Sequence, residues 1–157
     1  MSLLSWNCRE LGNLQTVKAL EKVVNKEEPI IVFLMETKSK RDWMEKVKEK
    51  CNMKHGLIVP SSGNSGGLPM MWKEEVKVDV KTYSYDYLDA WVDGGLDVGW
   101  WHLIGFYGNP EIAKRLESWA KLKYLKGTLS LTWLAIGDFN EITSLLEKEG
   151  GSMRLRK

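Results

Sequence analysis

Cysteine is scarce in this chain of 157 residues, and the two present, Cys8 and Cys51, are too few for a disulfide scaffold. We therefore expect a reducing, intracellular compartment, nuclear or cytoplasmic. A long hydrophobic run is missing too, because no apolar stretch approaches the ~20 residues that a membrane-spanning helix needs. The opening residues lack the basic start of a secretory signal, so neither a membrane segment nor a signal peptide is expected.

The sequence also lacks an excess of one charge. Lysine and arginine number 23 against 21 aspartates and glutamates, which leaves a net charge of +2. This balance excludes nucleic-acid binding by bulk charge, so any contact with phosphates must come from local patches. Apolar residues make up 43% and charged residues 28%, which excludes general disorder. The eight tryptophans indicate a packed domain with aromatic-lined clefts.

The first third of the chain alternates apolar strands with amphipathic helices. We expect strands at residues 2–7 and 30–35, and helices at 14–28 and 39–51. The second helix is predicted to begin at a capping box formed by Ser39 and Asp42. Such alternation favours α/β layering.

The rest of the chain adds further strands and one more helix. Turn residues 61–67 separate two apolar runs, and Asp93-Gly94-Gly95 is typical of a hairpin turn between two strands. Helical spacing predicts a helix whose apolar face carries Ile112, Leu116, Trp119, Leu122 and Leu125. The expected strands lie at 56–59, 68–72, 76–80, 88–92, 98–106 and 131–136, and the helix at 111–126.

Polar side chains recur at, or just beyond, the C-terminal ends of the apolar strands. They include Asn7, Glu36, Asn109, Asp138 and Asn140. Ligands of layered α/β proteins bind in the crevice beyond strand ends, and oxygen donors with few histidines suit Mg²⁺, which needs only one or two protein carboxylates. The alternative is that the asparagines are turn residues and Glu36 is a surface acid.

Short motifs at these strand ends are the most specific feature of the sequence. They are Met35-Glu36-Thr37-Lys38 and Gly137-Asp138-Phe139-Asn140, supported by residues 5–9, 65–68, 72 and 105–108. Together they resemble the endonuclease/exonuclease/phosphatase family, most closely the N-terminal endonuclease domain of plant LINE-type (non-LTR) retrotransposon proteins. The resemblance implies an α/β (α+β) layered sandwich, of which this chain would hold the N-terminal portion, with one incomplete domain at 1–151 and a basic tail at 152–157.

The resemblance also implies an activity, Mg²⁺-dependent phosphodiester hydrolysis that nicks DNA. Glu36 would be the metal ligand with Asn7 beside it, and Mn²⁺ could replace Mg²⁺. Asp138 would orient or activate the attacking water, Asn140 would hydrogen-bond a phosphate oxygen, and Tyr107 would sit against the phosphate or the leaving oxygen. The implied partner is DNA or another nucleic-acid phosphodiester.

A Ser-Asp-His element that the family carries near its end does not occur in this sequence. The two histidines, His55 and His102, lack that context and are expected to be structural. The resemblance therefore implies truncation before the catalytic histidine, with weak activity or none. The second half of the two-sheet sandwich would be missing too, so the remaining sheet would expose apolar surface near residues 131–136 and could self-associate through it. The alternative is a non-catalytic metal- or nucleic-acid-binding remnant.

Overall fold

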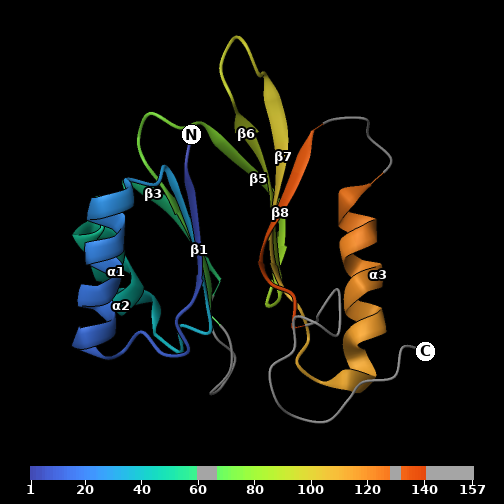
Figure 1. The fold of residues 1–157 in the computed structure, drawn as a ribbon, viewed down its shortest axis with the longest axis horizontal. Helices are drawn as coiled ribbons and strands as arrows, with labels where there is room; N and C mark the ends of the chain where they lie inside the picture. Colours follow the sequence, from blue (N-terminus) through green and yellow to red (C-terminus); the bar gives the residue numbers. More distant parts are fainter. Residues whose placement is uncertain (60–66, 128–131, 141–157) are drawn as a thin grey trace.

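A computed structural model describes residues 1–59, 67–127 and 132–140, and it shows two four-stranded sheets packed face to face (Figure 1). The strand orders are β1-β2-β4-β3 and β5-β6-β7-β8. The strands are β1 (Leu3–Asn7), β2 (Ile31–Met35), β3 (His55–Val59), β4 (Leu68–Trp72), β5 (Val78–Ser84), β6 (Tyr87–Asp93), β7 (Trp100–Tyr107) and β8 (Trp133–Asp138). The helices are α1 (Leu14–Glu27), α2 (Arg41–Lys50), the 3-10 turn η1 (Ile112–Lys114) and α3 (Arg115–Lys126). The α+β sandwich expected from the sequence is confirmed, but the expectation that its second sheet is missing is wrong, because β5, β6, β7 and β8 form that sheet.

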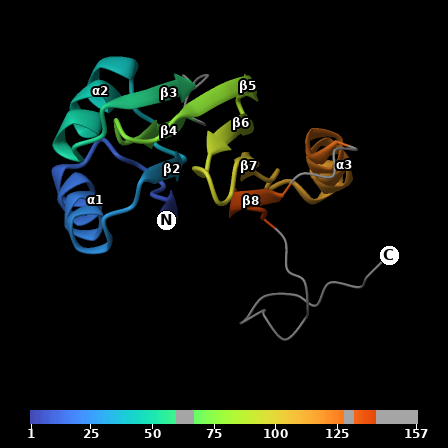
Figure 2. The same cartoon turned by 90° about the horizontal axis from the view of Figure 1, so that it is seen from above.

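Helices cover the outer faces of both sheets, with α1 and α2 on the first and α3 on the second (Figure 2). The strand β2 is buried on both faces, as its continuous apolar sequence predicts. Val32 and Leu34 pack with residues of α1 and α2, whereas Phe33 and Met35 belong to the core between the sheets. This core is tight, since a Cβ atom at Gly105 would approach the ring of Phe33 to 2.7 Å.

The register of the parallel strand pairs sets which residues meet at the end of the sandwich. β1 pairs with β2 in parallel, which places Asn7 opposite Met35. β7 pairs with β8 in parallel, which places Tyr107 opposite Asp138. The carboxyl ends of two strands therefore lie side by side in each sheet, and the residues that follow them share one edge.

The start of α2 corrects the expected capping box. Lys40 occupies the N-cap position without a side-chain hydrogen bond to the helix. Ser39 instead donates its hydroxyl to the carbonyl of Thr37 at 2.8 Å, and both residues are buried. The serine lies one residue before the N-cap position, so it does not cap the helix. Its hydrogen bond to Thr37 lies within the segment that connects β2 to α2.

The helix α3 and the strand β8 also differ from expectation. Ile112 lies in η1 and is 71% exposed, and Leu116 in the first turn of α3 is 84% exposed, so the predicted apolar face is wrong at its start. The last strand begins at Trp133 on the edge of its sheet, and the expected start at Leu131 lies outside the described residues, as does the basic tail at 152–157. None of the helices in the described part of the chain is long and apolar enough to span a membrane.

Candidate active site

The strand ends bring together the five residues to which the family resemblance gives a role. Asn7 donates its side-chain amide to Asp138 Oδ2 at 3.0 Å, which joins the end of β1 to the end of β8. Tyr107, at the end of β7, donates its hydroxyl to Glu36 Oε1, directly after β2. Asn140 donates its backbone N–H to Asp138 Oδ1 at 2.9 Å. The hydrogen bonds of Asn7 to Asp138 and of Tyr107 to Glu36 therefore each join a residue at the end of the first sheet to one at the end of the second.

The carboxylate of Asp138 is held at both oxygens, by Asn7 and by Asn140. A third contact holds its backbone, whose N–H donates to the Met35 sulfur at 3.1 Å. The pattern of polar residues in the sequence does not point to Met35, because the residue reads as an ordinary member of an apolar strand. A carboxylate fixed in this way presents its remaining lone pairs in a set direction, as a group that orients water requires.

The phenol of Tyr107 is kept protonated. Burial raises its pKa, and the hydrogen bond and negative charge of Glu36 raise it further, with a smaller contribution from Asp138 and an opposing one from Asn140. At neutral pH Tyr107 therefore acts as a neutral hydrogen-bond donor and not as a base.

The backbone after the strands adopts conformations that are rare for residues other than glycine. Glu36 has φ 53° and Asn140 has φ 50°, both in the left-handed region. The side chain of Asn140 donates to the carbonyl of Gly108, and a Cβ at Gly108 would lie 2.1 Å from the carbonyl oxygen of Phe139. Glycine is thus required where the β7 and β8 ends approach each other. Backbone strain of this kind clusters at functional sites.

The donor set of the site suits a hard cation. Glu36 supplies a carboxylate, and Asn7 supplies an amide oxygen that accepts the backbone N–H of Arg9 at 3.1 Å. In residues 1–59, 67–127 and 132–140 no three His, Cys, Asp or Glu side chains come together to hold a metal. A cation here would have few protein ligands and oxygen ligands only, the arrangement typical of Mg²⁺ and unlike a zinc site.

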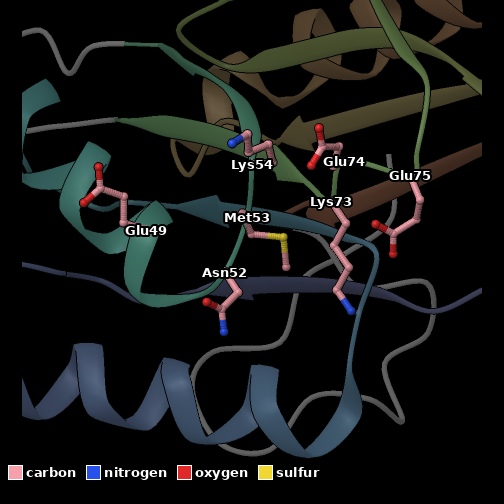
Figure 3. Close-up of a pocket in the computed structure, with 7 residues that line it drawn as sticks. All are labelled: Glu49, Asn52, Met53, Lys54, Lys73, Glu74 and Glu75. Atoms are coloured by element: carbon pink, nitrogen blue, oxygen red, sulfur yellow. The ribbon is translucent and has the colours of Figure 1, made fainter.

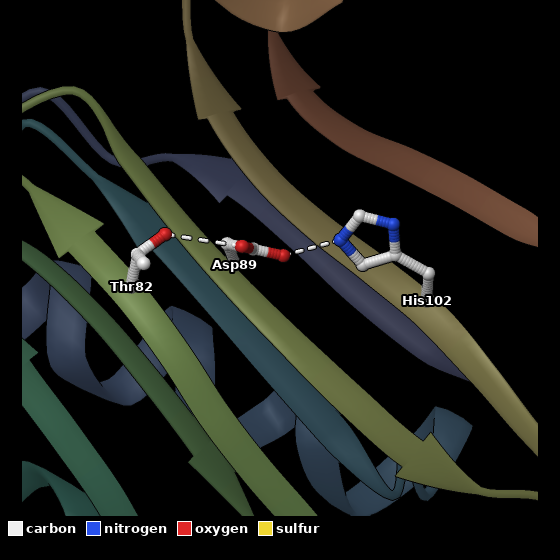
Figure 4. A network of polar contacts seen from close by, with 3 residues as sticks. All are labelled: Thr82, Asp89 and His102. Atoms are coloured by element: carbon white, nitrogen blue, oxygen red, sulfur yellow. Dashed lines mark hydrogen bonds and ion pairs between the residues drawn. The ribbon is translucent and has the colours of Figure 1, made fainter. Parts of the chain in front are cut away.

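Neither histidine reaches this site. His55 begins β3 opposite Trp72, at the other end of the first sheet from Glu36, and its ring stacks on Trp72 with centroids 6.2 Å apart. His102 precedes Tyr107 by five residues on β7, which separates them by ~16 Å along the strand. Its Nε2 bonds to Asp89, whose other oxygen accepts the Thr82 hydroxyl at 3.0 Å (Figure 4).

The thiol of Cys8, directly after Asn7, is not an activated nucleophile. It donates to the carbonyl of Met35 at 3.2 Å. Burial raises its pKa to about 11, with a smaller contribution from the charge of Glu36. Reactive cysteines have a lowered pKa, so Cys8 has the opposite of the required property.

A shallow pocket lies at the far end of the first sheet (Figure 3). It is lined by residues around the end of α2 and by the turn after β4, where Trp72 pairs with Ile31 at the start of β2. Glu36 follows the opposite end of β2, so this pocket adds nothing to the candidate site. Its lining residues are Glu49, Asn52, Met53, Lys54, Lys73, Glu74 and Glu75.

The chain therefore has a two-sheet sandwich whose parallel strand ends carry a group of oxygen donors. This combination can be compared with known families. The sequence matches the endonuclease/exonuclease/phosphatase family over residues 4–156, and the chain belongs to that family. No curated protein matches it in sequence.

Solved structures share the fold at low sequence identity. The AP endonuclease LMAP from Leishmania major is 14% identical with a TM-score of 0.72, over 96% of this chain and 58% of that one. The endonuclease domain of TRAS1, a telomere-specific non-LTR retrotransposon, is 13% identical with a TM-score of 0.61, over 90% and 61%. D. rerio TDP2 complexed with a single-strand DNA product is 17% identical with a TM-score of 0.65, over 90% and 61%. The chain thus spans less than two thirds of each of these structures.

Proposed function

We propose that this chain carries the metal- and phosphate-binding part of a Mg²⁺-dependent phosphodiesterase that acts on nucleic acid, with Mn²⁺ as an alternative metal. The observation that supports this most is the hydrogen-bonded group of Asn7, Glu36, Tyr107, Asp138 and Asn140 at one end of the sandwich. Four of these side chains come from four different strands or strand ends, and an enclosed apolar core lies directly beneath them.

We also propose a retroelement origin, of the plant LINE type, for this domain. The motifs around Glu36 and Asp138 support it, and so does the shared fold with the TRAS1 endonuclease domain. Cys8 and Cys51 are free thiols, in agreement with a reducing compartment, nuclear or cytoplasmic.

Each side chain has a proposed part in the hydrolysis. Glu36 and Asn7 would hold the cation, which supplies charge neutralisation at the phosphoryl oxygens. Asp138 would orient or activate the attacking water, because both of its oxygens are fixed by neighbours. Tyr107 would donate to the phosphate or the leaving oxygen, since its raised pKa keeps the proton in place. Asn140 would donate a side-chain N–H to a phosphate oxygen, beside Tyr107 and the Gly108 carbonyl that its side chain contacts.

A non-catalytic metal- or nucleic-acid-binding module is the second candidate, and one observation favours it. The two histidines of the chain are His55 and His102, and both lie away from the strand ends. This chain therefore brings no imidazole to the attacking water. Binding of metal and phosphate needs no general base, whereas hydrolysis typically gains ~10²–10⁴ in rate from one, most often a histidine.

Binding to DNA is expected to depend on Mg²⁺ and on basic residues beside the strand ends. Arg9, Lys38 and Lys40 are exposed directly after β1 and β2. Fluorescence anisotropy with a labelled duplex should show tighter binding in Mg²⁺ than in EDTA, and Lys40→Gln should weaken it and reduce its salt dependence. Lys22→Gln, an exposed change on α1, serves as the matched control. Equal affinity in Mg²⁺ and EDTA, or equal effects of both substitutions, would contradict DNA binding at this site.

We further propose that the chain self-associates through the edge of the second sheet. β8 is the edge strand, and its first two residues, Trp133 and Leu134, are 38% and 42% exposed. Exposed apolar edge strands pair readily with other chains. Sedimentation at increasing protein concentration should show dimers or larger species, and Leu134→Lys should shift the protein toward monomer. A wild-type chain that stays monomeric across the concentration series would refute this proposal.

A further inference from the structure

A single sulfur atom connects the two sheets beneath the candidate site. Met35 is the last residue of β2, is 1% exposed, and lies in the core between the sheets. Its Sδ accepts the backbone N–H of Asp138, the last residue of β8, at 3.1 Å. Because β2 and β8 belong to different sheets, this contact is a directional link within a region otherwise packed by apolar side chains.

The backbone before Asp138 is shaped for this contact. Gly137 has φ 142°, which L side chains rarely adopt, and a Cβ there would lie 1.8 Å from the carbonyl oxygen of Phe106. Only glycine can follow this path. The path leads directly into the N–H that meets Met35, so the glycine of the Gly-Asp-Phe-Asn motif and the methionine of the Met-Glu-Thr-Lys motif act on the same bond.

We propose that Met35 is a positioning residue, whose thioether fixes the backbone of Asp138 and thereby places the Asp138 carboxylate relative to Glu36. The inference rests on the proposed roles of Glu36 and Asp138 in metal and water binding. Glu36 follows Met35 directly in the chain, so one short segment supplies the metal ligand and also anchors the water-orienting group of the opposite sheet.

Physical chemistry explains why a methionine serves here. Apolar packing between two sheets is not directional, so it does not by itself fix the orientation of a single backbone N–H at a strand end. A side chain with an oxygen acceptor at this position would cost free energy, because its remaining lone pairs would be buried without hydrogen-bond donors. A thioether is apolar enough for the core and still accepts a weak hydrogen bond. Met35 can therefore fix the backbone N–H of Asp138, while Asn7 and Asn140 hold the carboxylate of the same residue.

The test compares Met35→Leu with Met70→Leu in the full chain. Leucine keeps nearly the volume of methionine and removes the sulfur acceptor. Met70 is fully buried in the same core, so its substitution controls for packing. In ¹⁵N-labelled, metal-free protein we expect Met35→Leu to shift the backbone amide signal of Asp138 and the side-chain amide signals of Asn7. Met70→Leu should leave these signals in place.

A second measurement uses the unmodified protein, so that the inference can be tested even if Met35→Leu does not fold. The Asp138 amide should exchange slowly with solvent, because its hydrogen is bonded inside the sandwich. Exchange at the rate of an unfolded chain would overturn the proposal. So would unchanged Asp138 and Asn7 signals in Met35→Leu, or equal changes in Met70→Leu.

Mn²⁺ titration then separates this inference from the proposed function. If wild-type protein binds Mn²⁺ at Glu36 and Asn7, Met35→Leu should bind it about tenfold more weakly, because the Asp138 carboxylate that Met35 positions holds the side chain of the metal ligand Asn7. Unchanged affinity in Met35→Leu would overturn the positioning role. Absence of Mn²⁺ binding in the wild type would refute the proposed metal site, whereas the NMR and exchange measurements, made without metal, would still decide on Met35.

Discussion

Glu36→Gln should abolish the binding of Mg²⁺ and Mn²⁺ to this chain. Glu36 is the only charged ligand that we assign to the cation, and Asn7 adds a neutral amide oxygen. Mg²⁺ is held in proteins by one or two carboxylates, so replacing the single carboxylate by an amide removes most of the attraction. Calorimetric titration of wild-type protein should give a weak isotherm with one site, and the variant should give none.

The substitution is chosen to leave the rest of the site in place. The amide oxygen of glutamine can still accept the hydroxyl proton of Tyr107, so the contact between β2 and β7 is retained. Glu10→Gln is the matched control, because Glu10 is an exposed acid in the segment after β1. Identical isotherms for wild type and Glu36→Gln would refute the metal site. A loss in Glu10→Gln of the same size would show a general charge effect instead.

Measuring the free energy of unfolding of the same samples as a function of pH would check the raised pKa of Tyr107. Its pKa is raised in the folded chain by burial and by Glu36, so the folded state holds the phenolic proton more tightly than the unfolded state does. This contribution to stability is complete below the ordinary pKa of tyrosine and is lost as the pH rises toward the raised pKa. Glu36, whose carboxylate helps to raise the pKa of Tyr107, is also the proposed metal ligand.

The proximity of the candidate residues could be predicted because the sequence signals for it are local. An apolar strand followed by a polar residue can be read from a few adjacent letters, and parallel strands bring such ends to the same edge. Asn7, Glu36 and Asp138 were found in this way, and the structure places them together.

The features that the sequence did not predict depend on contacts between distant segments. Met35 reads as core, and only the arrangement of the sheets shows that its sulfur meets Asp138, 103 positions away. Ser39 carries the signature of a helix cap, but Lys40 occupies the N-cap position and the Ser39 hydroxyl donates to Thr37 instead. Leu116 has helical spacing, but it lies in the first turn of α3 and is exposed there. Propensity and periodicity state what a residue can do, and tertiary packing selects which of these it does.

Nicking of supercoiled DNA by this chain should be undetectable, or several orders of magnitude slower than nicking by an endonuclease such as the TRAS1 domain measured in parallel. The physical reason is the position of the histidines. A positioned general base contributes ~10²–10⁴ to the rate, and no imidazole of this chain reaches the attacking water. His102 has an aspartate partner, as a catalytic histidine often does, but Asp89 and Thr82 hold it far along β7 from Tyr107 (Figure 4).

The assay must separate trace hydrolysis from a contaminating nuclease, and Asp138→Asn provides the control. The asparagine keeps the shape of the side chain and can still accept one of the two hydrogen bonds, from Asn7 or from Asn140, but it no longer carries the carboxylate that would orient or activate water. Both proteins would be purified identically and assayed with Mg²⁺, with Mn²⁺ and with EDTA. Brisk, metal-dependent nicking by the parent and none by Asp138→Asn would show that the interpretation of the chain as catalytically incomplete is wrong. Asp138 itself would then be a candidate for the base, since His55 and His102 both lie away from the candidate site. Equal faint activity in both proteins would point to contamination and would agree with the interpretation that no general base of this chain acts at the attacking water.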